Sequence, residues 1–271
     1  MTREFESPLQ LGIAGTALDV CGPEGWLAPL QRVWIRWRPQ STIPAWPVEI
    51  VADETCALPD APLFETMPRC RGGECELTGN GFLGHISAAG ECATLRAHPQ
   101  ATPADVGYFL RVVLAVQGFT RGGLLFHAAG IAHRNRGYAL FGVSGSGKST
   151  AARLSAPDPV LNDDLLVLWP DEDAWRIYAT PFGMNLGAAG SSIRLHALLR
   201  LVKAPRVFLE PLPAGRALGE LVANTPVLAG DVSWLPEVFA RWEKVMSKIP
   251  VRALHFQKEP TFWEVIDAEL G

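Results

Sequence analysis

The chain has no stretch rich in lysine or arginine, and its 271 residues carry a formal net charge of −4. A protein that binds nucleic acid or an anionic membrane surface through charge needs a basic patch, so neither partner is expected. Charged residues amount to 19% and hydrophobic residues to 48%, which is typical of a folded protein and not of a disordered one. A chain of this length can form one large domain or two small ones.

Long apolar runs are also missing. The first eight residues lack the apolar core of a signal peptide, and no segment is long enough to span a bilayer. We therefore expect a cytoplasmic protein that has no membrane partner.

Cysteine is scarce, and the five cysteines all precede residue 100. An odd number of cysteines in a chain without a secretion signal predicts free thiols in a reducing compartment. The spacing Cys70-x4-Cys75 is not typical of a metal site, so we expect the cysteines to be unliganded.

Residues 1–100 are predicted to be β-rich. Alternation of apolar and polar residues predicts a strand over residues 33–38, and shorter strands are predicted at 47–51 and 92–95. Proline and glycine between these segments indicate the turns of an antiparallel meander. The region contains no recognisable catalytic group of residues.

A helix is predicted from Thr102 to Gln117, because Thr102 can cap its N-terminus, Pro103 suits the first position and Asp105 suits the first turn. A buried strand over residues 124–132 follows and contains His127. Judged by itself, such a histidine is more often a core residue than a functional one.

The strongest motif is Gly142-Val-Ser-Gly-Ser-Gly-Lys-Ser149, which follows the short apolar run 138–141 and matches the P-loop pattern. Its glycines let backbone N–H groups approach a phosphate closely, Lys148 supplies a positive charge, and the Ser149 hydroxyl can bind Mg²⁺. The motif predicts a nucleotide-phosphate site made by Gly142, Ser144, Gly145, Ser146, Gly147, Lys148, Ser149 and Thr150.

Two adjacent acids, Asp163 and Asp164, follow the P-loop and precede the apolar run 165–169. Phosphoryl transfer needs an acid that holds Mg²⁺ and a base that accepts the proton of the attacking hydroxyl. A solvated acidic turn is the alternative, and the nearby P-loop favours the functional interpretation.

The remaining residues predict a short helix after the P-loop, a hairpin of 165–169 with 175–179, helices at 215–223 and 234–249, a last strand at 250–256 and a terminal helix at 260–266. The glycine-containing loop 180–190 is either a lid over the phosphate or a plain connector. Arg194 and Arg200 could approach a phosphate or face solvent, and the sequence does not decide between these.

The segment 124–183 resembles the HPr kinase/phosphorylase superfamily, which is related to phosphoenolpyruvate carboxykinases. The resemblance is carried by Leu125-Phe-His-Ala-Ala-Gly130, by residues 140–150 and by Leu161-Asn-Asp-Asp164. It is strongest toward the smaller HPr-kinase-like proteins, which include kinases of lasso-peptide precursors. About a quarter of the chain is covered, and residues 1–100 have no match.

The resemblance implies ATP as phosphate donor, Mg²⁺ and transfer to a serine hydroxyl. By position, His127 corresponds to the active-site histidine, Lys148 to the P-loop lysine and Ser149 to the metal-binding hydroxyl. Asp164 resembles the general base and Asp163 its metal-associated neighbour, and the two roles could be exchanged.

Two features depart from the HPr enzymes themselves. Thr150 stands where they have an acidic residue, and residues 180–190 show no counterpart to their second, glutamate-containing signature. Phosphorylase activity and HPr as the acceptor are therefore not expected.

The sequence thus predicts an α/β protein with an HPr-kinase/PEP-carboxykinase-like P-loop core in residues 101–271 and a β-rich region in residues 1–100. The predicted function is an ATP- and Mg²⁺-dependent kinase that acts on a serine of a peptide or small protein. The alternatives are a kinase of a free amino acid or sugar, and a nucleotide-binding switch without catalysis. Family members are often homo-oligomers, although no interface is evident in the sequence.

Overall fold

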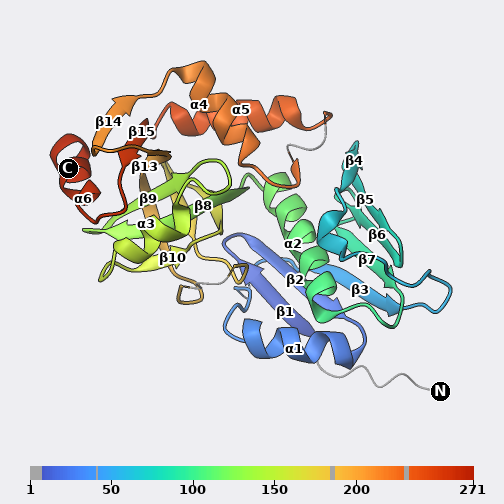
Figure 1. Cartoon of the computed structure of the whole chain (residues 1–271). Helices are drawn as coiled ribbons and strands as arrows, with labels where there is room; N and C mark the ends of the chain where they lie inside the picture. Colours follow the sequence, from blue (N-terminus) through green and yellow to red (C-terminus); the bar gives the residue numbers. More distant parts are fainter. Residues whose placement is uncertain (1–7, 41, 184–186, 229–231) are drawn as a thin grey trace. The chain divides into compact units, whose positions relative to one another are not determined.

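The computed structural model describes residues 8–40, 42–183, 187–228 and 232–271. Two compact units make up the chain (Figure 1): the first runs to Gly122 and also contains Trp234, and the second begins at Gly123 and reaches the C-terminus. With two sheets and, in the described ranges, six α-helices, this is a mixed α/β protein. The predicted domain ranges 1–100 and 101–271 stay a prediction. The first unit described here runs to Gly122 and so includes the helix after residue 102.

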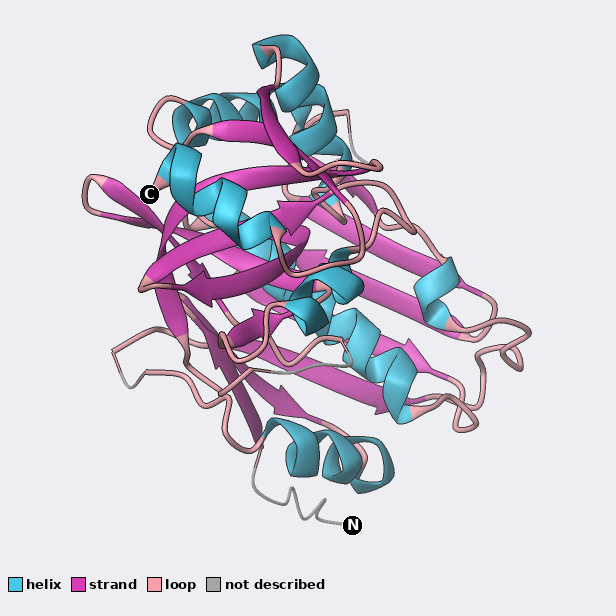
Figure 2. Ribbon diagram, turned by 60° about the vertical axis from the view of Figure 1, so that its left-hand side comes forward, coloured by secondary structure: helices cyan, strands magenta, loops and turns pink. Residues whose placement is uncertain are grey.

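The first unit is built on seven strands: β1 (Leu9–Ile13), β2 (Thr16–Cys21), β3 (Trp46–Ala52), β4 (Arg69–Arg71), β5 (Glu74–Gly79), β6 (Phe82–Ser87) and β7 (Cys92–Ala97). They form one mixed sheet in the order β1-β2-β3-β7-β6-β5-β4. Figure 2 shows the strands of both units in magenta and the helices in cyan. β3 runs parallel to both β2 and β7, and the other neighbours are antiparallel. The predicted strands at 47–51 and 92–95 are confirmed as β3 and β7, but the antiparallel meander holds only for β4 to β7.

A helix, α1 (Glu24–Trp34), lies where part of a strand was expected at residues 33–38, so that prediction was wrong. Trp34 and Trp37 are buried, whereas Val33 is 57% exposed. Buried residues three apart belong to a helical turn, and the alternation of apolar and polar residues was therefore misleading.

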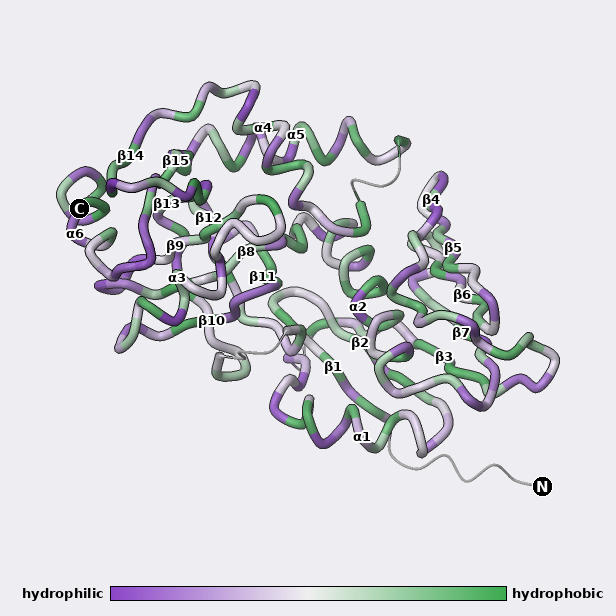
Figure 3. The backbone as a smooth tube through the Cα atoms, viewed as in Figure 1, coloured by the Kyte–Doolittle hydropathy of each residue, from purple (hydrophilic) through white to green (hydrophobic). Residues whose placement is uncertain are grey.

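The predicted helix after residue 102 is confirmed as α2 (Pro103–Thr120), which ends three residues later than expected. Thr102 and Asp105 form a capping box, in which the Thr102 N–H donates to Asp105 Oδ2 over 2.9 Å. The helix is apolar around most of its circumference (Figure 3) and is buried accordingly. Its one buried amide, Gln117, bonds both the N–H and the C=O of Ala17 in β2, at 3.0 and 2.9 Å. A short 3₁₀ helix, Leu63–Glu65, contacts α2.

Cys70 and Cys75 form a disulfide, so the expectation of free thiols was wrong for this pair. The two residues face each other across β4 and β5, which a tight turn joins at Gly72 and Gly73. Both glycines have positive φ, and the turn therefore brings the two sulfur atoms together. The other three cysteines are free thiols, as expected.

In the part of the second unit that the structure describes there are eight strands: β8 (Leu124–His133), β9 (Arg136–Phe141), β10 (Val160–Asn162), β11 (Leu165–Asp171), β12 (Ala174–Tyr178), β13 (Ser192–Lys203), β14 (Phe208–Pro211) and β15 (Val251–Phe256). Five strands pair in a closed ring, in which β8 pairs with β11, β11 with β12, β12 with β13, β13 with β9, and β9 again with β8. β10 joins β8, β15 joins β13 and β14 joins β15. The predicted strands at 124–132 and 250–256 and the hairpin of β11 with β12 are confirmed.

The described residues of the second unit form four α-helices: α3 (Lys148–Leu154), α4 (Ala214–Ala223), α5 (Leu235–Met246) and α6 (Phe262–Leu270). α3 and α6 share one core cluster with β8, β9, β13 and β15, to which α6 contributes Phe262, Trp263 and Ile266. α5 packs against β8, where the centroids of the Trp242 and Phe126 rings lie 4.8 Å apart. All four helices were predicted, with bounds that differ by up to four residues. No helix in the described part of the chain combines the length and hydrophobicity needed to cross a membrane.

One buried ion-pair cluster joins α6 to the sheet. His133, at the end of β8, contacts a carboxylate through each ring nitrogen: Nδ1 lies 2.6 Å from Asp158 and Nε2 lies 3.1 Å from Asp267 of α6. Its ring also stacks on Trp263 at 4.1 Å. The imidazole therefore holds three separate chain segments together.

We expect His133→Ala to lower the free energy of unfolding by about 2–3 kcal/mol, because it removes the histidine from two half-buried carboxylates, of which Asp267 keeps its ion pair with Arg134 and Asp158 does not have a second one among the described residues. His255→Ala is the matched control, since His255 also pairs with a carboxylate and stacks on a ring, but against the exposed Glu210 and Phe208. Its expected cost is about 1 kcal/mol or less. Urea unfolding at neutral pH measures the free energy of unfolding of both variants, and an equal decrease in the two would contradict the prediction.

Candidate functional site

Three parallel strands end at one edge of the second sheet. β9 and β15 both pair in parallel with β13, which sets Phe141 beside Arg200 and Lys203 beside Phe256. The segments after these strands therefore lie at the same edge, the position where ligands bind in open α/β sheets. The P-loop motif is the segment that follows β9.

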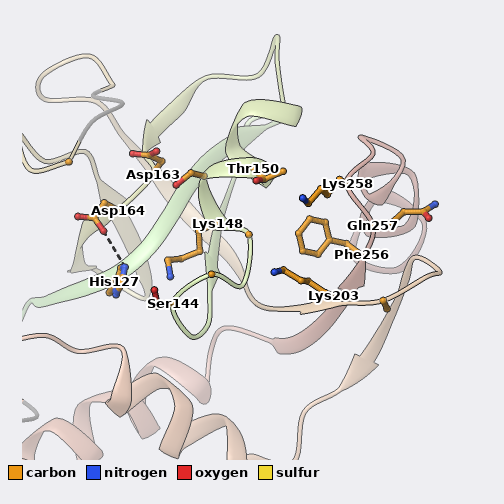
Figure 4. A pocket seen from close by; sticks show the side chains of 15 residues that line it. His127, Ser144, Lys148, Thr150, Asp163, Asp164, Lys203, Phe256, Gln257 and Lys258 are labelled. Carbon is orange, nitrogen blue, oxygen red and sulfur yellow. Dashed lines mark ion pairs between the residues drawn. The ribbon is translucent and has the colours of Figure 1, made fainter.

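A cavity of about 720 Å³ opens at this edge (Figure 4). Six of the eight predicted phosphate-binding residues line it: Ser144, Gly145, Gly147, Lys148, Ser149 and Thr150. Gly142 and Ser146 do not line it. Gly142 accepts a hydrogen bond through its carbonyl, and Ser146 is buried.

The loop needs glycine at two crowded or strained positions. Gly147 has φ +110°, and a Cβ at this residue would lie 2.8 Å from the Phe256 ring. Gly142 has φ +146° and closes against Ser146. A side chain at either position would strain the backbone, so the loop shape depends on these glycines.

Lys148 is buried at the base of the cavity, where its Nζ donates to the Gly142 carbonyl over 3.0 Å. Burial lowers the pKa of this ammonium group, and the nearby Asp164 carboxylate partly opposes that shift by raising it. An anion bound beside Lys148 would favour the charged form further.

His127 and the two acids line the same cavity. The His127 Nε2 lies 3.1 Å from Asp164 Oδ1 (Figure 4), and this contact bridges β8 to the turn before β11. Both side chains reach solvent, at 38% and 45% exposure, whereas Asp163 is buried. An acceptor could therefore approach Asp164 more readily than Asp163.

The turn that carries the acids is fixed by Asn162, whose role the sequence analysis did not anticipate. Asn162 is fully buried, and its Oδ1 accepts from the N–H groups of Asp164 and Leu165 at 2.7 and 3.0 Å. Its amide nitrogen donates to the carbonyls of Thr180 and Phe182 at 3.1 and 2.6 Å. One side chain thus ties the acidic turn to the segment that passes over it.

Gly183 completes this arrangement and lines the cavity. Its φ is +115°, and a Cβ there would lie 3.0 Å from Asn162 Oδ1 and 3.1 Å from Asp164 Cβ. Only glycine permits this close approach without strain. The lid predicted over 180–190 includes residues 184–186, which lie outside the described residues, and it stays a prediction.

The cavity has a second set of lining residues that the sequence analysis missed: Lys203, Ala204, Phe256, Gln257 and Lys258. They lie at the ends of β13 and β15. The sequence pattern that could have identified the two lysines is a lysine at the end of an apolar strand, or just after it. Of the two arginines left open, Arg200 pairs with Glu220 at 2.7 Å, and neither it nor Arg194 lines the cavity.

The donor set suits Mg²⁺ shared with phosphates and not a metal held by protein alone. No cluster of three or more His, Cys, Asp or Glu side chains suited to a metal occurs among the described residues. Ser149 and Asp163, the predicted ligands, offer hard oxygen atoms in the same cavity as the P-loop. Mg²⁺ commonly takes only one or two protein oxygens and completes its shell with phosphate and water, which fits these residues.

No family model matches the chain, and no curated protein matches it either. Among solved structures 65 chains match. One is the HPr(Ser) kinase/phosphatase from Coxiella burnetii, with 12% identity over 53% of this chain and 94% of that chain and a TM-score of 0.30. The chain thus has a distant structural similarity to that protein, too weak to support an argument about function.

Proposed function

We propose that the chain is an ATP- and Mg²⁺-dependent kinase that transfers the γ-phosphate to a serine hydroxyl of a peptide or small protein. The observation that carries the proposal is one cavity that joins a P-loop with a buried lysine to a solvent-accessible carboxylate paired with a histidine. A nucleotide-binding switch has no need of the second half of this arrangement.

In the proposed reaction the acceptor oxygen attacks the γ-phosphorus, and the bond from that phosphorus to the bridging oxygen breaks, releasing ADP. Asp164 takes the proton of the attacking hydroxyl, and His127 holds that carboxylate in place. Lys148 and the N–H groups of the loop bind the phosphate oxygens. Positioning and neutralisation of charge supply most of the rate in such reactions.

Mg²⁺, when bound between Ser149, Asp163 and the phosphates, would neutralise charge on the β- and γ-phosphate oxygens. Buried Asp163 suits a ligand that stays with the nucleotide, and exposed Asp164 suits a base that meets an exchanging acceptor. This difference in exposure favours the assignment of the two acids over its reverse.

The test uses γ-labelled ATP and Mg²⁺ with a panel of serine-containing peptides, the same peptides with alanine for serine, and free serine and sugars. We expect label to move to a serine peptide and not to its alanine version. Label on small hydroxyl compounds alone would overturn the peptide assignment. Absence of ATP binding would overturn the function itself.

Lys148→Ala is expected to weaken ATP binding by about 10- to 100-fold, because it removes a charge-assisted contact to the β- and γ-phosphates. Calorimetric titration of ATP with Mg²⁺ measures the loss. Lys244→Ala, which removes an exposed lysine of α5, is the matched control and should bind ATP normally. Normal binding by Lys148→Ala would remove the P-loop from the proposal.

A further inference from the structure

Two lysines form a cationic end of the cavity, separate from the P-loop. Lys203 is the last residue of β13, and Lys258 lies two residues after β15. Because β13 and β15 are parallel, with Lys203 beside Phe256, both lysines arrive at the edge where the P-loop lies. Both line the cavity, and in Figure 4 they lie on either side of the Phe256 ring.

Neither ammonium group has a carboxylate partner within the described residues, unlike several other cations of this unit. Lys248 pairs with Asp173, and Arg200 pairs with Glu220. The two like charges at one cavity repel each other, and no carboxylate of the described residues forms an ion pair with either of them. An anionic ligand in the cavity would supply the missing partner.

The position of Lys148 indicates which part of the ligand meets these lysines. In Figure 4, Asp164 and His127 lie on one side of Lys148, and Thr150, Lys203 and Lys258 lie on the other. The γ-phosphate must lie near Asp164, which receives the acceptor proton. The rest of the phosphate chain then extends past Lys148 toward Thr150 and the two lysines.

We propose that Lys203 and Lys258 bind the phosphates of the nucleoside diphosphate portion of the donor, the part that leaves as ADP. The inference rests on the proposed function and adds two binding residues to it. Because these contacts exist before and after transfer, they should stabilise bound ATP and bound ADP to a similar extent. Lys148, which meets the β- and γ-phosphates, should favour ATP over ADP.

The test measures Kd for ATP and for ADP with Mg²⁺ in a Lys203→Gln, Lys258→Gln double variant. Glutamine keeps a flexible polar side chain, one atom shorter than lysine, and removes the charge. We expect Kd to rise about tenfold for both nucleotides at low salt, with a smaller difference at high salt. The control Lys244→Gln, Lys248→Gln removes two charges from the α5 region and should stay within about twofold of wild type.

Wild-type Kd values in the double variant would overturn the inference and leave the kinase function intact. A raised KM for the acceptor with unchanged nucleotide Kd would overturn it as well, because the lysines would then bind the acceptor. Nucleotide binding that depends on both lysines, without transfer to any acceptor, would overturn the kinase and support the inference. If the wild type binds neither nucleotide, both fail together.

Discussion

Asp164→Asn is expected to reduce phosphoryl transfer by a factor of about 10²–10⁴ while the Kd for ATP stays within about threefold of the wild type. Asparagine has nearly the same shape as aspartate, so the turn and the loop should keep their structure. It cannot accept a proton, and this is the property on which the proposed step depends. The loss should therefore fall on kcat and not on nucleotide binding.

The substitution has a second consequence at Lys148. The Asp164 carboxylate raises the pKa of this buried ammonium group, and its removal lets burial lower the pKa further. In the variant Lys148 should therefore lose its proton at a lower pH than in the wild type. ATP binding followed as the pH is raised should weaken earlier in Asp164→Asn.

The measurements are single-turnover transfer of label and titration of ATP, with Asp173→Asn as the control. Asp173 is a fully exposed acid in the β11–β12 turn, and its loss changes the net charge equally. Unchanged transfer by Asp164→Asn would remove the residue from the role of base. If Asp163→Asn removed transfer instead, and Asp164→Asn only raised the Mg²⁺ requirement, the two roles would be exchanged.

Local signals in the sequence predicted the parts of the fold that depend on neighbouring residues. Examples are the capping box of Thr102 and Asp105, the short helix after the P-loop, and the hairpin of β11 with β12. The strand predicted at 33–38 failed because tryptophans three apart were interpreted with a period of two. The disulfide was missed because the two cysteines were judged by metal-site spacing and not by the Gly72-Gly73 turn between them, which marks a hairpin that pairs Cys70 with Cys75.

The sequence predicted those residues of the candidate site that belong to the P-loop motif or to the pair of adjacent acids. Lys203 and Lys258 were missed because β13, a strand of 12 residues, was not predicted, and only its parallel pairing with β9 and β15 brings the lysines to the P-loop. Asn162 stands next to the acids in sequence, yet its function depends on carbonyls about 20 residues further on. Contacts of this range follow from topology and not from spacing.

Asn162→Ala is expected to lower the free energy of unfolding by about 2–4 kcal/mol and to reduce kcat more than it changes the Kd for ATP. The deletion leaves the N–H groups of Asp164 and Leu165 and the carbonyl of Phe182 without this partner, in a place that water cannot easily reach. The turn should then sample several conformations, and Asp164 should spend less time in reach of the acceptor.

A stability effect alone must be separated from a positioning effect. Leu221→Ala removes a fully buried side chain of α4 and should cost a similar amount of stability through a cavity, while Asn162 and its hydrogen bonds to the acidic turn are kept. At a temperature where both variants remain folded, Leu221→Ala should keep the kcat of the wild type and Asn162→Ala should not. Equal kcat values in the two variants would show that Asn162 stabilises the unit without positioning Asp164. A selective loss in Asn162→Ala would mean that the reactive geometry of the acid is held from the rear of the cavity, by the one amide that joins both chain segments around it.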